Sequence, residues 1–97
     1  MRKKYNISYI NLYKACLNAL KRLAITIEYT DKNEGLIKGF TKASMLSWGE
    51  NITIRLNRID DHQTEIDIKS NVSSQLFSWG KDSMNENNII TEIEKII

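Results

Sequence analysis

The hydrophobic period of this chain changes twice, from the roughly 3.6 residues of a helix to the two of a strand and back again. Residues 8–23 and the stretch from about residue 82 to the end carry apolar side chains at helical steps, whereas residues 25–72 mostly alternate. Short turn signals divide the alternating part, and short links join successive strands into an antiparallel meander. The pattern therefore predicts a two-layer α+β fold, α-β-β-β-β-α, with both helices packed on one face of a four-stranded antiparallel meander.

The two predicted helices differ in how they begin. Ser8 is the expected N-cap of the first, whereas Asp82 or Ser83 would cap the second, with Glu86 completing a capping box. The buried stripe of the first is expected to hold Ile10, Tyr13, Leu17, Leu20 and Leu23, with Cys16 and Ala24 beside it. That of the second is expected to hold Ile89, Ile93, Ile96 and Ile97, with Ile90 and Met84 at its edge.

Four strands are predicted between these helices, at about 25–30, 36–42, 52–57 and 65–72. Gly35 offers a positive φ to the first turn, and residues 60–63 form a hairpin turn. The side chains expected to face the core are Ile25, Ile27, Tyr29, Ile52, Ile54, Leu56, Ile66 and Ile68. Residues 1–7 are expected to be a frayed N-terminus, which leaves the edges of the first and fourth strands free for self-association.

The composition suits one domain covering residues 1–97. Of the 97 residues 41% are apolar, and 14 basic against 12 acidic side chains give a net charge of +2. This balance is too even to indicate a nucleic-acid partner. No stretch approaches the roughly 18 apolar residues of a membrane span, and no signal-peptide core follows the basic start, so we expect a cytoplasmic protein.

Residues that could support catalysis or bind a metal are sparse. The one cysteine, Cys16, lies on the apolar side of the first helix and is expected to be a buried small hydrophobe. The one histidine, His62, stands beside Asp60 and Asp61 in a predicted turn, where aspartates serve the backbone. The sequence therefore predicts a protein that is not an enzyme and has no catalytic residues, metal or cofactor.

The tripeptide Ser-Trp-Gly occurs twice, as MLSWGEN at 45–51 and LFSWGKD at 76–82, and contains both tryptophans. In a meander both segments leave the same end of the sheet. Two interpretations stay open: the indoles seal that end of the core, or the apolar side chains form an exposed interaction patch. The patch would comprise Met45, Leu46, Trp48, Leu76, Phe77 and Trp79.

The two motifs also carry a resemblance. SWGENITI at 47–54, FSWGKD at 77–82 and Asn88-Ile89 are similar to the pattern of a family of small bacterial domains with paired Trp-Gly motifs. The second motif of that family usually reads Asp-Trp-Gly-Lys-Asn, where this chain has Ser78 and Asp82. The resemblance implies the same α+β fold and no particular activity.

The leading functional interpretation is a small non-catalytic interaction module. Its partner would be a protein, an apolar or membrane surface, or a second copy of the chain, bound at the Trp-bearing end of the sheet. The alternative is a nucleic-acid-binding domain that uses the basic strip of Arg2, Lys3 and Lys4. Glu65 and Asp67 on the predicted open face of the sheet oppose that alternative, since they would repel phosphate.

Overall fold

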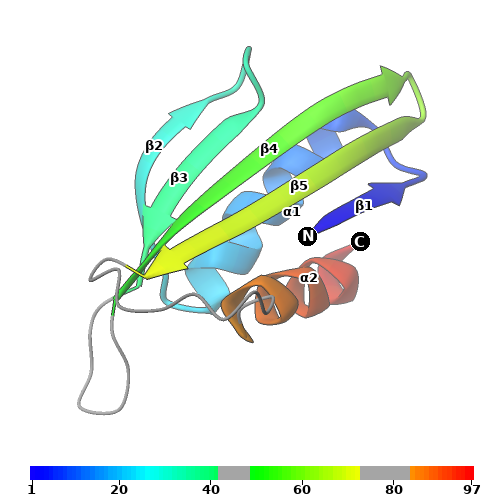
Figure 1. The fold of residues 1–97 in the computed structure, drawn as a ribbon. Coiled ribbons are helices and arrows are strands. Elements are labelled where there is room, and N and C mark those ends of the chain that lie inside the picture. The colour runs from blue at the N-terminus through cyan, green and yellow to red at the C-terminus, as the bar shows by residue number, and fades with distance from the viewer. Residues whose placement is uncertain (42–48, 73–83) are drawn as a thin grey trace.

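The computed structural model describes residues 1–41, 49–72 and 84–97. Its elements follow the predicted succession of helix, strands and helix, with one additional strand at the N-terminus (Figure 1). In chain order they are β1 (Arg2–Tyr5), α1 (Tyr9–Arg22), β2 (Thr26–Asp31), β3 (Leu36–Phe40), β4 (Glu50–Asp60), β5 (Gln63–Val72) and α2 (Met84–Ile96).

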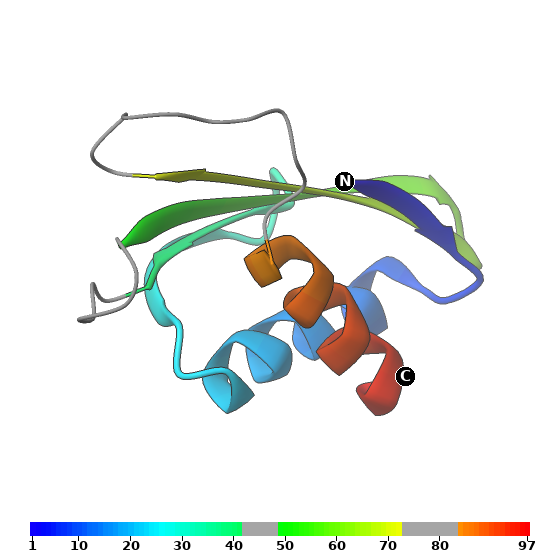
Figure 2. The ribbon, with the colours of Figure 1, turned by 60° about the horizontal axis from the view of Figure 1, so that its bottom comes forward.

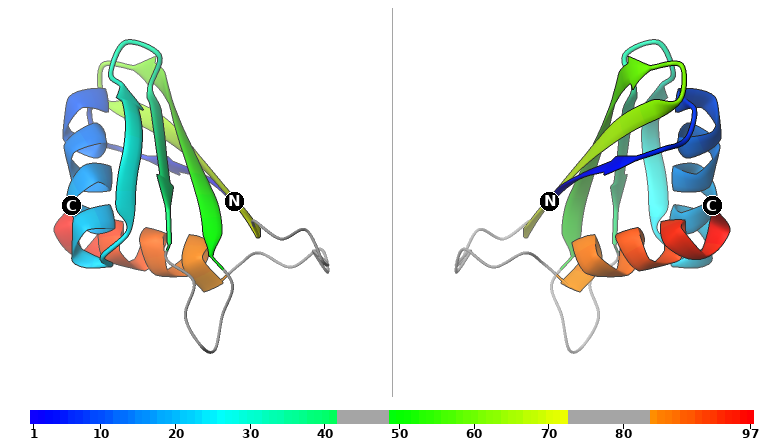
Figure 3. Two further views of the ribbon diagram at one scale, coloured as in Figure 1. Left: turned by 90° about the vertical axis from the view of Figure 1, so that its left-hand side faces the viewer. Right: turned by 90° about the vertical axis from the view of Figure 1, so that its right-hand side faces the viewer.

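The strands form one antiparallel sheet in the order β1-β5-β4-β3-β2. Both helices lie on the same face of this sheet, and the other face is left uncovered by them (Figures 2 and 3). The prediction of an α+β fold with an antiparallel sheet and two helices is confirmed. The predicted number of strands is wrong, because the described sheet has five.

The additional strand, β1, comes from the residues that were expected to be frayed. It pairs with β5 in a register that places Lys3 opposite Ile66 and Arg2 opposite Asp67. Its sequence, RKKY, has no apolar alternation, and cross-strand ion pairing such as that of Arg2 with Asp67 at 3.7 Å supports it instead. Because β1 covers β5, the expected free edge of the fourth predicted strand is also wrong.

The core lies between the sheet and the helices. Ile37, Ile54 and Ile68 stand directly opposite one another on three neighbouring strands, and all three are fully buried. Leu56 and Ile66 form the next row, which is also buried. These rows confirm the inward faces predicted for β4 and β5, as expected for a sheet covered on one side.

Helix α1 begins as predicted and buries much of the predicted face, including Tyr13, Cys16 and Leu20, whereas the places of Ile10 and Ala24 were predicted wrongly. The Ser8 hydroxyl accepts the N–H of Asn11 at 3.4 Å, which confirms the N-cap. Ile10, expected in the core, is 44% exposed, and Ala24 is exposed as well. The buried residues are Leu12, Tyr13, Ala15, Cys16, Ala19 and Leu20, so the stripe is centred on small side chains that allow a close approach to α2 and the sheet.

Strand β2 departs from strict alternation because it contains a bulge. The register shifts between Ile27, opposite Gly39, and Tyr29, opposite Lys38. The extra residue turns Tyr29 to the uncovered face of the sheet, where it is 49% exposed. The expectation that Tyr29 faces the core is therefore wrong.

Helix α2 carries the predicted stripe over most of its length. Ile89, Ile90 and Ile93 are buried and Ile96 packs against the core cluster, whereas Ile97 follows the helix and is 46% exposed. The prediction that Ile97 belongs to the buried stripe is therefore wrong. Within the three described ranges, no helix is long and apolar enough to cross a membrane.

Candidate functional site

The six residues predicted to form an interaction patch all lie outside the described part of the chain. They are Met45, Leu46 and Trp48 in the β3–β4 connection, and Leu76, Phe77 and Trp79 in the β5–α2 connection.

The strand ends that bound these connections are described, and they lie side by side. Thr41 donates its backbone N–H to the Glu50 carbonyl at 2.9 Å, and its hydroxyl accepts the Glu50 N–H at 2.9 Å. Glu50 is in turn paired with Val72, the last residue of β5. Thr26, at the start of β2, pairs with Phe40 at the end of β3. The prediction that both connections leave the same end of the sheet is therefore confirmed.

A buried carboxylate stands on the helix side of the sheet, in the first turn of α2. Glu86 is 6% exposed, and its two oxygens accept from the Met1 ammonium at 3.1 Å and from the Ser70 hydroxyl at 2.9 Å. The same ammonium donates to the Ile68 carbonyl at 2.7 Å. A buried charge is stable only when it is paired and hydrogen-bonded, and the Glu86 carboxylate meets both conditions within the protein. The cluster joins the N-terminus, β5 and α2, and no ligand is needed to account for it.

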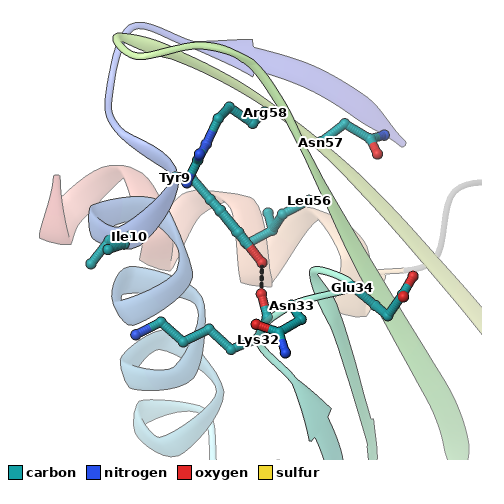
Figure 4. A pocket seen from close by; sticks show the side chains of 8 residues that line it. All are labelled: Tyr9, Ile10, Lys32, Asn33, Glu34, Leu56, Asn57 and Arg58. Atoms are coloured by element: carbon teal, nitrogen blue, oxygen red, sulfur yellow. Dashed lines mark hydrogen bonds between the residues drawn. The ribbon is translucent and has the colours of Figure 1, made fainter.

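A hollow of about 610 Å³ lies at the opposite end of the strands, where the start of α1 meets the β2–β3 turn and the second half of β4 (Figure 4). Tyr9 crosses it and donates its hydroxyl to the Lys32 carbonyl. The Tyr13 ring meets the Tyr9 ring edge-on, with centroids 6.1 Å apart, and the Arg58 guanidinium lies 5.2 Å from the Tyr9 centroid. These contacts hold Tyr9 on three sides.

The β2–β3 turn beside this hollow is held by a side-chain carboxylate and by a backbone hydrogen bond to β4. One carboxylate oxygen of Asp31 accepts the N–H groups of Asn33 and Glu34 at 3.0 and 3.1 Å. Gly35 has a φ of 69°, as predicted, and its carbonyl accepts the Leu56 N–H at 2.8 Å. The turn beside the hollow is therefore held by hydrogen bonds within the protein.

The charges around the hollow are unequal. Arg58 and Lys32 line it, and Glu34 is the one acidic residue of the lining. In Figure 4 the Glu34 carboxylate is directed away from Tyr9 and α1, whereas the Lys32 side chain extends toward α1. Burial is the main cause that raises the pKa of Tyr9, so the phenol stays protonated and adds no negative charge.

Cys16 and His62 carry potentially reactive side chains, and each occupies a position with a structural explanation. Cys16 is fully buried, as predicted, and burial raises the pKa of its thiol to about 12. His62 lies in the β4–β5 turn, and the neighbouring Asp60 carboxylate accepts the His62 backbone N–H at 2.7 Å. Among residues 1–41, 49–72 and 84–97, no three His, Cys, Asp or Glu side chains are grouped so that they could hold a metal ion.

Arg2, Lys3 and Lys4, which were considered for nucleic-acid binding, form part of strand β1. Arg2 pairs with Asp67 at 3.7 Å, and Lys3 pairs with Glu94 of α2 on the opposite face. Side chains that alternate across a strand cannot present one continuous positive strip. The two acidic partners also offset part of the charge that phosphate would require.

The hollow around Tyr9 is the site that sequence reasoning missed. The sequence shows that Tyr9 and Tyr13 are one helical turn apart. Arg58 and the β2–β3 turn come close to Tyr9 only in the folded protein. The spacing of residues along the chain carries no signal for such a site.

No family model matches the chain, and no curated protein does. A solved structure is similar: a chain in the crystal structure of the adenylate sensor from AMP-activated protein kinase in complex with 5-aminoimidazole-4-carboxamide 1-beta-D-ribofuranotide (ZMP). The match has a TM-score of 0.71 and covers 95% of this chain and 94% of that chain at 14% identity. At this identity the likeness shows a shared fold alone, since one fold hosts many functions.

Proposed function

We propose that the protein is a small non-catalytic interaction module that binds a protein partner, or a second copy of itself, at the Trp-bearing end of its sheet. The observation that supports the proposal is the adjacency of three strand ends. Thr41 and Glu50 bound the first connection with Ser-Trp-Gly, and the second begins after Val72. Two tryptophans tethered to neighbouring strand ends suit an interface centre, where Trp is enriched. The structural roles of Cys16 and His62 support a function without catalysis.

Tryptophan fluorescence distinguishes this proposal from the interpretation that the indoles seal the core. If Trp48 and Trp79 form an exposed interaction patch, their emission is expected to be red-shifted and to be quenched by iodide in the monomer. Binding of a partner should then protect both indoles from quenching. Blue-shifted emission protected in the isolated monomer would contradict the patch.

Alanine variants provide the second test. In a patch, Trp48→Ala and Trp79→Ala leave stability nearly unchanged and weaken self-association, measured by sedimentation, or partner capture from the native cell. As core plugs they would lose about 3–5 kcal/mol in urea unfolding. Tyr29→Ala is the matched control, since Tyr29 is an exposed aromatic side chain on the uncovered face and away from that end. Capture by lipid vesicles or single-stranded nucleic acid instead of protein would also contradict the proposal.

A further inference from the structure

We infer that the hollow around Tyr9 binds a small organic anion, whose carboxylate or phosphate group pairs with Arg58 and Lys32 while its apolar body packs against Tyr9 and Ile10. This site lies at the end of the sheet opposite the Trp-bearing connections, so it is independent of the proposed interaction surface. Its volume of about 610 Å³ is within the range of small-molecule sites.

The two cations that line the hollow, Arg58 and Lys32, have no acidic partner among the described residues. Among the described residues, the ion pairs use the Met1 ammonium, Arg2, Lys3, Arg22 and Lys95 as cations, and none uses Arg58 or Lys32. Of the nearby acidic residues, Asp31 is close enough to contribute, in addition to burial, to the raised pKa of Tyr9 but does not line the hollow. One oxygen of Asp31 holds the turn amides, and Glu34 is turned away (Figure 4).

The Arg58 guanidinium lies beside the Tyr9 ring. Its central carbon lies 5.2 Å from the Tyr9 centroid, a cation–π distance that favours this position of the side chain. A guanidinium presents its N–H donors in a fork that matches a carboxylate or phosphate with two parallel hydrogen bonds. Lys32 adds a second positive charge from the facing turn.

Apolar side chains lie beside these charges in the lining of the hollow. Ile10 is an apolar residue of α1 that is 44% exposed, and it lines the hollow together with Leu56 and Tyr9. In Figure 4 Ile10 and the Lys32 side chain extend on the same side of Tyr9. An anion with a flat apolar body would cover Ile10 while its charged group reaches Arg58.

The test uses amide chemical shifts of the full chain titrated with phenyl phosphate, benzoate and neutral benzamide. We expect saturable shifts of the Lys32, Asn33 and Arg58 amides with one or both anions and none with benzamide. Phenyl phosphate against benzoate decides which oxyanion is preferred. No saturable shift with either anion, or equal shifts with benzamide, would overturn the inference.

Arg58→Gln should weaken anion binding by about tenfold or more, the loss expected for a charge-assisted pair. Arg55→Gln is the matched control, because Arg55 lies on the same strand but on the uncovered face, opposite Asp67. Lys32→Gln, in an exposed turn, gives a second reading should Arg58→Gln perturb the fold. Equal weakening by Arg55→Gln and Arg58→Gln, or no weakening by either pocket variant, would contradict the site.

Discussion

Ala24 holds an unusual backbone conformation for a residue other than glycine. Its φ is 57°, and it follows α1 at the position where helices commonly end on glycine. The Ala24 N–H donates to the Lys21 carbonyl at 3.1 Å, and the Ile25 N–H donates to the Leu20 carbonyl at 2.9 Å. These two bonds are those of a Schellman motif, which turns the chain from α1 into β2.

Ala24→Gly should stabilise the protein by about 1 kcal/mol, because glycine enters the left-handed region without the penalty that a Cβ atom brings. Urea unfolding followed by circular dichroism measures the change. Ala24→Val is the control and should destabilise, since branching at Cβ raises that penalty. A less stable Ala24→Gly variant would show that the left-handed angle is not what limits this position.

Gly35 meets two constraints at once. Its φ is 69°, and an added Cβ atom would lie 2.4 Å from the Leu56 carbonyl oxygen and 3.2 Å from the Tyr9 hydroxyl. Gly35→Ala should therefore cost about 2–4 kcal/mol, from backbone strain together with displacement of β4. Glu34→Ala, next to it on the exposed turn, should stay within about 0.5 kcal/mol. Urea midpoints of the two variants check both values, and equal midpoints would contradict the steric argument.

At the scale of elements, β1 and α2 are joined by a polar clasp. The Glu94 carboxylate accepts from Lys3 and, at 2.8 Å, from the Tyr5 hydroxyl. The hydrogen bond from Lys3, followed by that from Tyr5, lowers the pKa of Glu94. Burial, followed by the bond to Glu94, raises the pKa of Tyr5, so the phenol remains the donor.

This clasp predicts a pH dependence of stability. A carboxyl whose pKa is lower in the folded state contributes above its ordinary pKa of 4.5 and loses that contribution as the pH falls through the lower folded value. Glu94→Gln should therefore be less stable than the parent at neutral pH, and the difference should shrink in acid. Urea midpoints over a pH series measure it. In a Lys3→Met background the effect of Glu94→Gln should be smaller, and an unchanged effect would contradict the coupling.

Helices and strands could be predicted from the sequence where burial of one face determines the spacing of apolar residues. Ile54 and Ile68 alternate because one side of the sheet is covered, so their faces could be read directly. Strand β1 could not, because it is stabilised by a neighbour more than 60 residues away, as the separation of 67 residues between Met1 and its partner Ile68 illustrates. Tyr29 faces the uncovered side of the sheet because of a β-bulge, and the alternation of apolar and polar residues does not reveal that bulge.

At the scale of the whole molecule, Cys16 reports on the core as one unit. It belongs to a single cluster of buried residues from α1, α2 and the sheet, and none of its surface is exposed. A thiol whose pKa burial raises to about 12 forms little thiolate in the folded protein, so it reacts only after the structure opens. The rate of its modification therefore measures the opening that exposes it.

We expect Ellman's reagent to modify native Cys16 far more slowly than the unfolded chain at mildly alkaline pH, with a rate that rises with urea as steeply as global unfolding does. If the opening is global, Ala24→Gly should slow the modification about fivefold, the factor that corresponds to about 1 kcal/mol. Ala24 lies outside the core cluster, so a local opening around Cys16 would leave the rate unchanged by that variant. Rapid modification in the absence of urea, or a rate indifferent to Ala24→Gly, would show that Cys16 is exposed by a local opening that leaves the C-terminal end of α1 intact.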